Sequence, residues 1–372
     1  MIVQRRRLRP WYTVAMRTAL TLLALGALTT GVVLSSLPSA ASEWPTHFCS
    51  TIIPPTHPGS CEVQLGARIP DLRREKIIVF GVIGDMGTGE PEQFVVADAL
   101  SAMCLQRRCQ FLISVGDNLY NGPTRLDDPR LQSWFEKPYG KLDLPFWMSL
   151  GNHDWYGDPT MEIRYTGVAS RRAKGPYWFM PGPAYRIPKL PGFLQLVAID
   201  TMSMEKGLDA GLKDQKLLLD VALPPAGDAA ARTWTFLYGH HPIRSSGAHG
   251  DTAEVESFLK PWLDGARVDG VFFGHDHHQE HYDFGLAQVF IQGASGQIRQ
   301  RMFDGERRRC SSTAQRDCSR WSALRLGFSI VTVTAESLVV TYFRIDEATR
   351  TAAVDYEYET RRDALFARQK PQ

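Results

Sequence analysis

The chain has 372 residues, of which 44% are hydrophobic, and its formal net charge is +2. This length allows one large domain with a substantial core, or two smaller domains. Five arginines and no acid lie within residues 1–42, so the rest of the chain has a formal charge of −3. A mildly acidic protein of this kind gives no support for binding to nucleic acid.

The first 42 residues have the pattern of an export segment. Several arginines precede an apolar stretch from about Thr18 to Leu37, and small residues follow at Pro38–Ser42. We favour a signal peptide that is cleaved after these small residues. The apolar stretch is also long enough to stay as a membrane anchor, which would be the chain's one membrane attachment. Either reading predicts a secreted or periplasmic protein.

The six cysteines form three couples that are close in sequence. They are Cys49 with Cys61, Cys104 with Cys109, and Cys310 with Cys318. Outside the cytoplasm an even number of cysteines usually forms disulfides, and three short loops are the simplest connectivity. The sequence leaves the other pairings open. We expect a structural role for these cysteines rather than a catalytic one.

Composition also suggests where ordered structure begins and ends. Residues 43–75 are rich in Pro, His and Cys without periodicity, so we expect an irregular extension there. Residues 76–346 are interpreted as the catalytic domain. Residues 347–372 are interpreted as a C-terminal tail.

Apolar runs of strand length recur through this domain. They are Lys76–Ile83, Phe111–Val115, Phe146–Leu150, Thr233–Tyr238 and Val271–Phe273. Helical periodicity appears between them at Pro91–Leu105, Leu212–Leu223 and Ala253–Leu263, and a hairpin is expected from Phe328–Thr334 and Leu338–Ile345. Alternating strands and helices indicate βαβ units. We therefore predict an α/β fold, a βαβαβ sandwich of two packed β-sheets flanked by helices.

Each of the five apolar runs ends in a glycine that is followed by polar side chains. The motifs are Gly84-Asp85, Gly116-Asp117-Asn118-Leu119-Tyr120, Gly151-Asn152-His153-Asp154, Gly239-His240-His241-Pro242 and Gly274-His275-Asp276-His277. Loops at the carboxyl ends of strands are where α/β folds gather ligand-binding groups, and glycine lets the chain turn sharply there. Five motifs in these positions can bring their side chains to one point.

The side chains of these motifs form a donor set for metal ions. The candidate ligands are Asp85, Asp117, Tyr120, Asn152, His240, His275 and His277. Oxygen donors mixed with imidazole suit Fe, Mn or Zn and contain too much nitrogen for Ca or Mg. Seven groups exceed the needs of one ion, whereas two ions that share a bridging carboxylate use them all. Any one motif alone would be an ordinary turn, so the prediction depends on their ordered combination.

The five ordered motifs resemble those of the calcineurin-like metallophosphoesterases. Tyr120, three places after Asp117, is the mark of the purple acid phosphatases, and the short single-domain form is similar to the tartrate-resistant acid phosphatases. The resemblance covers most of residues 76–345. Weaker agreement lies at Ser170-Arg171-Arg172, Pro181–Arg186 and Ala198–Thr201.

The resemblance implies a place for each ligand. Asp85, Tyr120 and His277 would hold Fe(III) together with Asp117. Asp117 would also bind a divalent ion (Fe, Zn or Mn) as the bridging ligand. The other ligands of this second ion would be Asn152, His240 and His275. From its chemistry alone, a phenolate at Tyr120 favours Fe(III) and would colour the protein, whereas a tyrosine packed in the core is the alternative.

The resemblance also implies an acid phosphatase that hydrolyses small phosphate monoesters through attack of a metal hydroxide on phosphorus. His153 and His249 are the candidates that protonate the leaving group or bind a phosphate oxygen, because histidine titrates in the useful range. His153 directly follows Asn152. His249 lies nine residues after His240, the offset at which related phosphatases carry a histidine.

Several neighbouring residues are given supporting or surface positions. We expect Asp154 and Asp276 to orient imidazoles or loops, and His241, His278 and His281 to lie at the rim or surface. Arg244 departs from the uncharged residue usual in the family, and would bind substrate phosphate or meet solvent. The cysteine-closed segment Arg307–Arg320 is rich in arginine, which favours a solvated loop over one that steers anions.

Other functions share these motifs. A phosphodiesterase or nucleotide hydrolase would use the same metal centre, because the walls that select the substrate lie in loops outside the motifs. A non-catalytic binding protein would be expected to lack a ligand, and all seven are present. An intracellular Ser/Thr protein phosphatase conflicts with the export segment and with Tyr120.

Overall fold

The protein is described by a computed structural model that covers residues 69–169, 174–223, 233–265, 268–285, 287–299 and 308–369. The chain divides into two compact units, Met1–Ser42 and Glu43–Gln372, and the described residues all belong to the second. The predicted export segment, the Cys49–Cys61 couple and most of the predicted extension lie outside the described residues. None of the helices in the described ranges is long and apolar enough to cross a bilayer.

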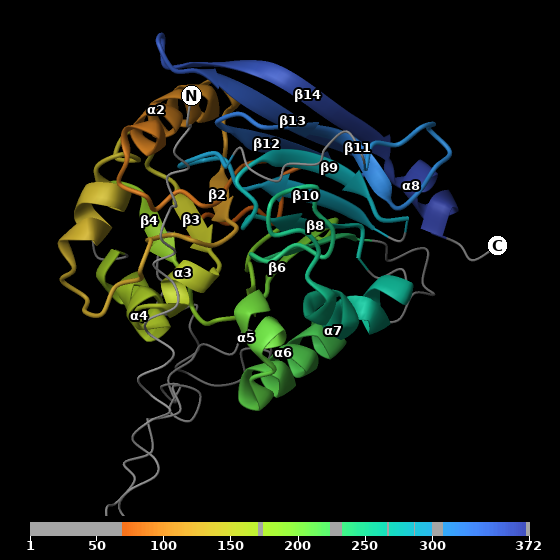
Figure 1. Cartoon of the computed structure of the whole chain (residues 1–372), viewed down its shortest axis with the longest axis horizontal. Helices are drawn as coiled ribbons and strands as arrows, with labels where there is room; N and C mark the ends of the chain where they lie inside the picture. The colour runs from red at the N-terminus through yellow and green to blue at the C-terminus, as the bar shows by residue number, and fades with distance from the viewer. Residues whose placement is uncertain are drawn as a thin grey trace, which may run out of the picture. The chain divides into compact units, whose positions relative to one another are not determined.

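Two seven-stranded β-sheets form the centre of the fold (Figure 1). The first has the order β14 (Thr351–Arg361), β13 (Ser337–Asp346), β12 (Gly327–Thr334), β1 (Ile77–Ile83), β2 (Phe111–Ser114), β3 (Pro145–Met148) and β4 (Tyr177–Phe179). The second has the order β11 (Cys318–Ala323), β9 (Gln279–Asp283), β10 (Gln288–Gln292), β8 (Gly270–Phe273), β7 (Trp234–Tyr238), β6 (Leu194–Ala198) and β5 (Tyr185–Arg186). With helices outside, these sheets confirm the predicted fold class.

Side chains of the central strands alternate between two cores. In β7 and β8, Phe236 and Phe272 belong to a core shared with the first sheet, whereas Leu237 and Val271 belong to a core shared with helices. The rings of Phe80 in β1 and Phe272 meet edge to face, with centroids 6.1 Å apart. Because successive strand residues point to opposite faces, both faces of a buried sheet must be apolar. This explains the continuous apolar runs in the sequence.

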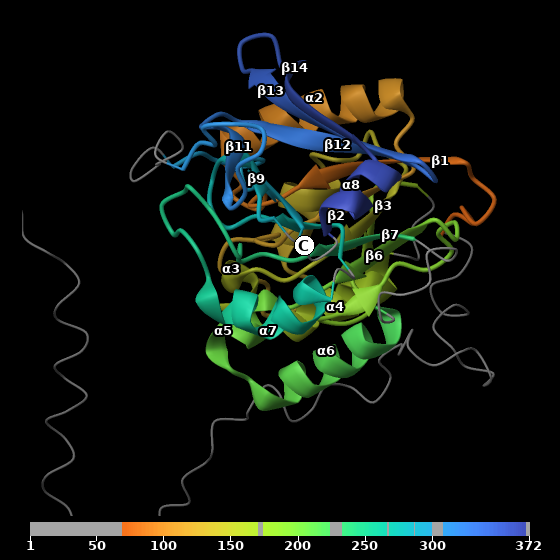
Figure 2. The ribbon, with the colours of Figure 1, turned by 90° about the vertical axis from the view of Figure 1, so that its right-hand side faces the viewer.

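Helices flank the two sheets, except the short α3 (Asn152–Trp155), which follows β3 at the edge of the first sheet. The others are α2 (Pro91–Arg107), α4 (Pro159–Ala169), α5 (Thr201–Lys206), α6 (Asp209–Ala222), α7 (Ala253–Asp264) and α8 (Arg362–Gln369), and a π-helix, η2, spans Leu131–Glu136. Figures 1 and 2 show α5, α6 and α7 along one side and α2 on the other. Helix α2 begins with a proline in its first turn and ends at Arg107, directly before Arg108, which has φ 59°. Both features are common helix boundaries.

Strands that precede the predicted motifs are neighbours and run parallel. In the first sheet β1 pairs with β2, and β2 pairs with β3. Ser114 pairs with both Ile83 and Met148, so these three strands end at nearly the same level. In the second sheet β7 pairs with β8 in the same way. The carboxyl ends of the strands therefore meet at one edge of each sheet.

The end of the chain adds two elements to the predicted hairpin. The hairpin is β12 and β13, which pair antiparallel. β14 and α8 lie within the stretch interpreted as a C-terminal tail, and β14 pairs with β13 from Thr351 to Arg361. β14 is an edge strand whose residues are mostly exposed or half-buried, so its sequence lacks the apolar run that marks the central strands. Two predicted disulfides are present, Cys104–Cys109 and Cys310–Cys318.

Candidate metal centre

The predicted ligands leave the sheets in strained backbone conformations. Asp85 follows β1, Asp117 follows β2 and His275 follows β8, and their φ angles are 55°, 52° and 68°. These values lie in the left-handed region, which few residues other than glycine adopt. Such conformations cost of order 1–3 kcal/mol each and cluster at functional sites, where the surrounding structure holds them in place. The strain points to a site where side-chain direction matters.

Two glycines allow these loops to approach one another closely. A Cβ atom on Gly151 would lie 2.2 Å from Oδ1 of Asp117. A Cβ atom on Gly116, which has φ 91°, would lie 2.6 Å from Nδ1 of His240. Any larger residue would displace the neighbouring side chain. Glycine is therefore required because the loops after β2, β3 and β7 touch.

His240 presents an unprotonated nitrogen to the centre of this loop cluster. Its Nδ1 lies 2.9 Å from the carbonyl oxygen of Val115, an acceptor, so Nδ1 carries the proton. Burial lowers the pKa of His240 well below its ordinary value, and the ring is neutral. Its Nε2 lies 3.0 Å from Oδ1 of Asn152 and 3.4 Å from Oδ1 of Asp117. Acceptors this close need a cation or a shared proton between them.

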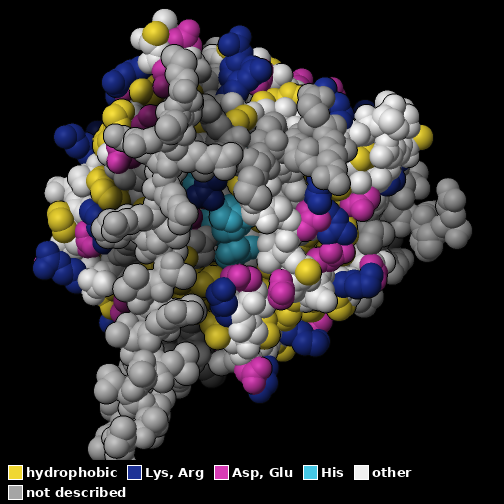
Figure 3. All heavy atoms as spheres, in the orientation of Figure 1, with side chains coloured by type: hydrophobic (Ala, Val, Ile, Leu, Met, Phe, Trp, Pro, Cys, Tyr) yellow, Lys and Arg dark blue, Asp and Glu magenta, His cyan; other side chains and the backbone are white. Residues whose placement is uncertain are grey.

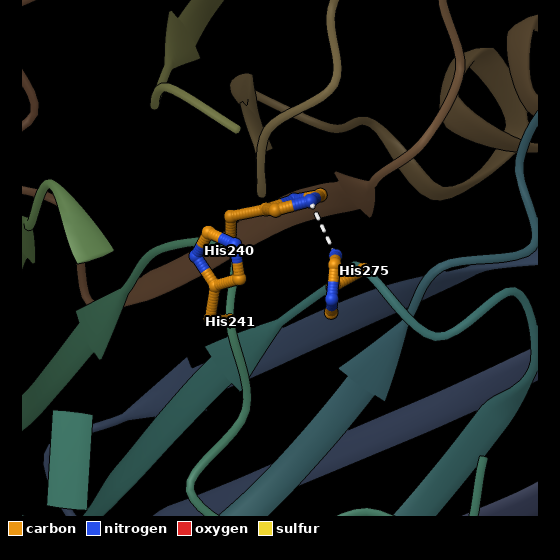
Figure 4. Close-up of side chains that lie close together, drawn as sticks. All are labelled: His240, His241 and His275. Atoms are coloured by element: carbon orange, nitrogen blue, oxygen red, sulfur yellow. Dashed lines mark hydrogen bonds between the residues drawn. The ribbon is translucent and has the colours of Figure 1, made fainter. Parts of the chain in front are cut away.

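His275 completes this group from the second sheet. Its Nδ1 lies 3.0 Å from Oδ1 of Asn152 and 3.2 Å from Nε2 of His240. Figure 4 shows the rings of His240 and His275 joined by this contact, with His241 beside them. One ligand atom from each of these three histidines lies within 4.8 Å of the others, a spacing that suits a metal ion.

A second group of donors surrounds Asp85. This carboxylate is fully buried, and its Oδ2 accepts the backbone N–H of His275 at 2.9 Å. Its Oδ1 receives no hydrogen bond from the described part of the chain and lies 3.3 Å from Nε2 of His277. That same Nε2 lies 3.0 Å from the Tyr120 hydroxyl, to which Gln297 is also hydrogen-bonded. A buried carboxylate oxygen without a donor is costly unless a cation binds there.

The electrostatics of the two aspartates also favour a cation. Burial raises the pKa of Asp85 and of Asp117 well above the ordinary range, and the charge of Asp85 raises the pKa of Asp117 further. One ligand atom each from Asp85, Asp117 and His240 lie within 4.8 Å of one another. Two buried carboxylates, a phenol, an amide oxygen and three imidazoles therefore fit a pair of transition-metal ions.

The two candidate proton donors lie beside this centre. The backbone N–H of His153 donates to Oδ1 of Asp117 at 2.9 Å, and its ring lies against Tyr120 with centroids 4.2 Å apart. Its Nδ1 is buried without a partner, and burial lowers the pKa of His153 to about 4. The ring of His249 lies against His275 with centroids 4.1 Å apart, and burial lowers its pKa as well.

Asp154 and Asp276 hold loops rather than imidazole rings. Asp154 accepts the backbone N–H groups of Asn118 at 2.9 Å, Leu119 at 3.0 Å and Gly151 at 2.7 Å, which ties two ligand loops together. Asp276 accepts the backbone N–H of His249 at 2.8 Å. These carboxylates fix the positions of the backbone at the centre.

The interpretation of His241, His278 and His281 as rim or surface residues was wrong. Their exposed fractions are 3%, 0% and 1%. His241 lies 2.8 Å from the Thr201 hydroxyl. His278 directly precedes β9 and His281 lies within it, and β9 lies between β10 and β11 in the second sheet. The strands that cover them come later in the chain, so no local pattern could show their burial.

The basic departures from the family pattern are held in ion pairs. The guanidinium of Arg244 donates to Glu256 at 2.6 Å and to Asp317 at 3.0 Å, so it neither faces free solvent nor remains available for substrate. In the arginine-rich segment, Arg308 bonds to Asp251. Arg320 bonds to Asp283 at 2.7 Å. Glu256 lies in α7 and Asp283 ends β9, and the sequence motifs include none of these acids.

Sequence reasoning missed a sixth loop at this centre, residues 293–299 after β10. Gly293 follows β10 directly, and a Cβ atom there would lie 3.0 Å from Oδ2 of Asp85. From the same loop, Gln297 is hydrogen-bonded to Tyr120, and the backbone N–H of Arg299 donates to the carbonyl of His277. The signal was present, because Gly293 repeats the pattern of a strand followed by glycine.

Comparison with known proteins places this architecture in a large group of enzymes. The family model of the calcineurin-like phosphoesterases matches residues 78–279, more than half of the chain. Purple acid phosphatase 4 of Arabidopsis thaliana is 31% identical over 238 residues, which are 59% of this chain and 68% of that protein. Tartrate-resistant acid phosphatase type 5 of Homo sapiens is 28% identical over 225 residues, 54% of this chain and 67% of that protein.

Solved structures show the same fold at lower sequence identity. GAP50, described as the anchor in the inner membrane complex of Plasmodium, aligns with a TM-score of 0.63 and 20% identity over 80% of this chain and 96% of that one. A purple acid phosphatase from seeds of yellow lupin, Lupinus luteus, aligns with a TM-score of 0.55 and 14% identity over 82% of this chain and 58% of that one. At these identities the likeness concerns the fold alone.

Proposed function

The chain belongs to the calcineurin-like phosphoesterases and, among them, to the purple acid phosphatases, and we propose that it is an exported acid phosphatase that hydrolyses phosphate monoesters. The observation that carries the proposal is the convergence of carboxylate, phenol, amide and imidazole donors at the edges of two sheets. Similar proteins are acid phosphatases by name, which supports hydrolysis of phosphate esters.

The family implies a dinuclear metal centre, and the donor set fits one. We propose the following ligands: Asp85, Tyr120 and His277 for Fe(III), Asp117 as the bridge, and Asn152, His240 and His275 for a divalent ion (Fe, Zn or Mn). When bound, the two ions supply Lewis acidity for the attack of water on phosphorus. The proton on Nδ1 of His240, held by the Val115 carbonyl, keeps Nε2 free to bind a metal.

His153 and His249 are proposed to act on the bound ester. His153 is fixed through its backbone to Asp117, and Nδ1 of its ring has no partner among the described residues. We assign it the transfer of a proton to the leaving oxygen. His249 is held by Asp276 through its backbone and by the contact of its ring with that of His275. We assign it a hydrogen bond to a phosphate oxygen.

Export is supported by two independent features. The disulfides Cys104–Cys109 and Cys310–Cys318 suit an oxidising compartment. The arginine-flanked apolar stretch at the N-terminus has the order of an export signal. We propose that the protein works in the periplasm or outside the cell.

The fold alone does not separate an enzyme from a binding protein. GAP50 shares this fold and is named an anchor. The ligand set favours an enzyme here, because an anchor has no need to bury uncompensated carboxylates beside neutral histidines. That cost is repaid when metal ions are bound.

The proposed activity is tested with two related substrates. The purified full-length protein, loaded with iron and a divalent metal, is assayed on para-nitrophenyl phosphate and on bis(para-nitrophenyl) phosphate. We expect a higher kcat/KM for the monoester, and loss of at least about a hundredfold in Asp117→Asn. A higher kcat/KM for the diester would make the protein a phosphodiesterase. No turnover of either ester by the metal-loaded protein would favour a binding role.

A further inference from the structure

Arg299 is anchored at both its backbone and its side chain to the candidate metal centre. Its backbone N–H donates to the carbonyl oxygen of His277 at 3.3 Å. Its Nη1 donates to Nε2 of His249, whose ring centroid lies 4.1 Å from that of His275. The backbone contact thus positions the residue, and the side-chain contact places the guanidinium beside a residue proposed to bind substrate.

We propose that Arg299 binds the phosphate group of the substrate and favours dianionic monoesters over diesters. The role deepens the proposed phosphatase function and depends on it. Nothing in the five sequence motifs includes this residue, because it lies in the loop after β10. The loop after β10 would then determine whether the site prefers substrates with two negative charges or with one.

Among the described residues, Arg299 differs from two other arginines in having no acidic partner. Arg244 and Arg308 form ion pairs with Glu256 and Asp251. Across the described ranges, no carboxylate lies within 4.0 Å of the Arg299 guanidinium, whose side-chain bond is to His249. Figure 3 shows histidines visible at the centre of one face with a Lys or Arg side chain beside them. An arginine without an acid partner at such a site is suited to bind an anion.

The geometry leaves most of the guanidinium donors available. Arginine has five N–H groups and no acceptor, so the contact with Nε2 of His249 uses one donor and, within the described ranges, leaves four. Arginine binds phosphate oxygens in a bidentate manner, and such charged hydrogen bonds are stronger than neutral ones.

Substrate charge explains why this residue would set a preference. Above its second pKa, near 6, a phosphate monoester carries about two negative charges and three unesterified oxygens. A diester carries one charge and two such oxygens. A fixed guanidinium therefore stabilises the bound monoester more than the bound diester.

A purely structural role for Arg299 makes a different prediction. If the residue only orients His249, its loss should weaken monoester and diester alike, because both esters present an oxygen to that imidazole. If its charge binds phosphate, its loss should raise the Kd of inorganic phosphate and should raise KM more for the monoester than for the diester. An equal rise in KM for the two esters would assign Arg299 to the support of His249 alone.

The test uses the metal-loaded full chain with Arg299→Gln and Arg299→Lys. Arg361→Gln is the control, since it removes the same charge from an exposed residue of β14, the far edge of the first sheet. Titration calorimetry gives the Kd of inorganic phosphate, and kinetics give KM and kcat for both nitrophenyl esters at a pH above 6. We expect about a tenfold rise in phosphate Kd and monoester KM for Arg299→Gln, with kcat changed less than about threefold.

The remaining outcomes each decide the proposal. The proposal is supported if phosphate binding partly recovers in Arg299→Lys and if the rise in KM is smaller for the diester. It is also supported if the effect of Arg299→Gln on the phosphate Kd becomes smaller at high salt. An unchanged phosphate Kd in Arg299→Gln, or an equal rise in Arg361→Gln, would overturn it. A wild-type protein that hydrolyses neither ester but binds phosphate through Arg299 would support this inference and refute the phosphatase function.

Discussion

Individual side chains determine which metals the centre prefers. Six of the seven candidate ligands are carboxylate, amide or imidazole groups, which suit several transition metals. The seventh, Tyr120, adds a phenol whose oxygen lies 3.0 Å from Nε2 of His277. Burial raises the pKa of Tyr120 well above its ordinary value, so the phenol would stay protonated without a cation. Detection of a Tyr120 phenolate would therefore be strong evidence that a metal ion binds at this centre.

Replacement of Tyr120 by phenylalanine should remove the visible colour of the iron-loaded protein. The phenolate that gives rise to charge transfer is lost, whereas the other ligands remain. Visible absorption of the purified variant is compared with that of Tyr156→Phe, a control in which an exposed tyrosine near His153 is changed. An absorption band that survives in Tyr120→Phe would exclude a ferric phenolate at this residue.

Buried histidines should make the fold sensitive to acid, and His281 offers a clean case away from the metal ligands. Burial lowers the pKa of His281 to about 4, from 6.5. Between these values the unfolded chain binds more protons than the folded one, so the stability present above pH 6.5 is lost as pH falls toward 4. The loss approaches about 1.4 kcal/mol per pH unit.

Replacement of His281 by asparagine should weaken that pH dependence. The variant also loses hydrogen bonds with Gln288 and Tyr356, so its free energy of unfolding should be lower at neutral pH. Between pH 6.5 and 4.5, the free energy of unfolding of the variant should nevertheless fall less steeply than that of the wild type. The difference in slope should correspond to the uptake of up to one proton on unfolding. Urea unfolding at a series of pH values measures both slopes. Parallel slopes would show that His281 does not titrate with unfolding.

The donor types could be predicted from the sequence, because each motif follows a strand within a few residues. Burial of His241 and pairing of Arg244 could not, since they depend on contacts with Thr201, Glu256 and Asp317. These partners are distant in sequence and belong to no recurring pattern. Arg299 was missed for a related reason: the glycine-containing loop before it lacks the acidic or histidine residue that marked the other five.

At the scale of elements, the site depends on loops that touch one another. The backbone N–H groups of Asn118 and Gly151 both donate to Asp154, which joins the loop after β2 to the loop after β3. At position 151 there is no room for a side chain, because a Cβ atom there would collide with Asp117. The local sequence pattern predicts the strands that precede these loops. It does not show that the loops lie close together, because their closeness follows from the parallel pairing of β1, β2 and β3.

Replacement of Gly151 by alanine should displace Asp117 and lower metal content. An added Cβ would lie 2.2 Å from Oδ1 of Asp117, so that side chain or the loop must move. We expect a loss of about a hundredfold in activity, because displacements near 1 Å have effects of that size. Gly167→Ala in α4 is the matched control, since its Cβ would meet nothing within 4 Å. Alanine there should stabilise the helix by about 0.5–1 kcal/mol. Normal metal content in Gly151→Ala would refute the account of this loop.

At the scale of the whole molecule, the centre joins residues that are far apart in sequence. Loops after β1, β2 and β3 come from the first sheet, and loops after β7, β8 and β10 come from the second. The order of strands and helices could be predicted, since each apolar run is local. The packing of the two sheets against each other could not be predicted, because it depends on contacts between distant residues, such as that of Phe80 with Phe272. The edge strand β14 could not be predicted either, because its sequence lacks an apolar run.

Metal analysis of the purified full-length protein, by mass spectrometry with protein concentration from amino-acid analysis, tests the central claim most directly. We predict about two metal ions per chain, at least one of them iron, because two ions sharing a carboxylate use all the donors. A colourless protein that contains only zinc or manganese would contradict the iron assignment. An active protein with no more than about one ion per chain would contradict the dinuclear centre itself.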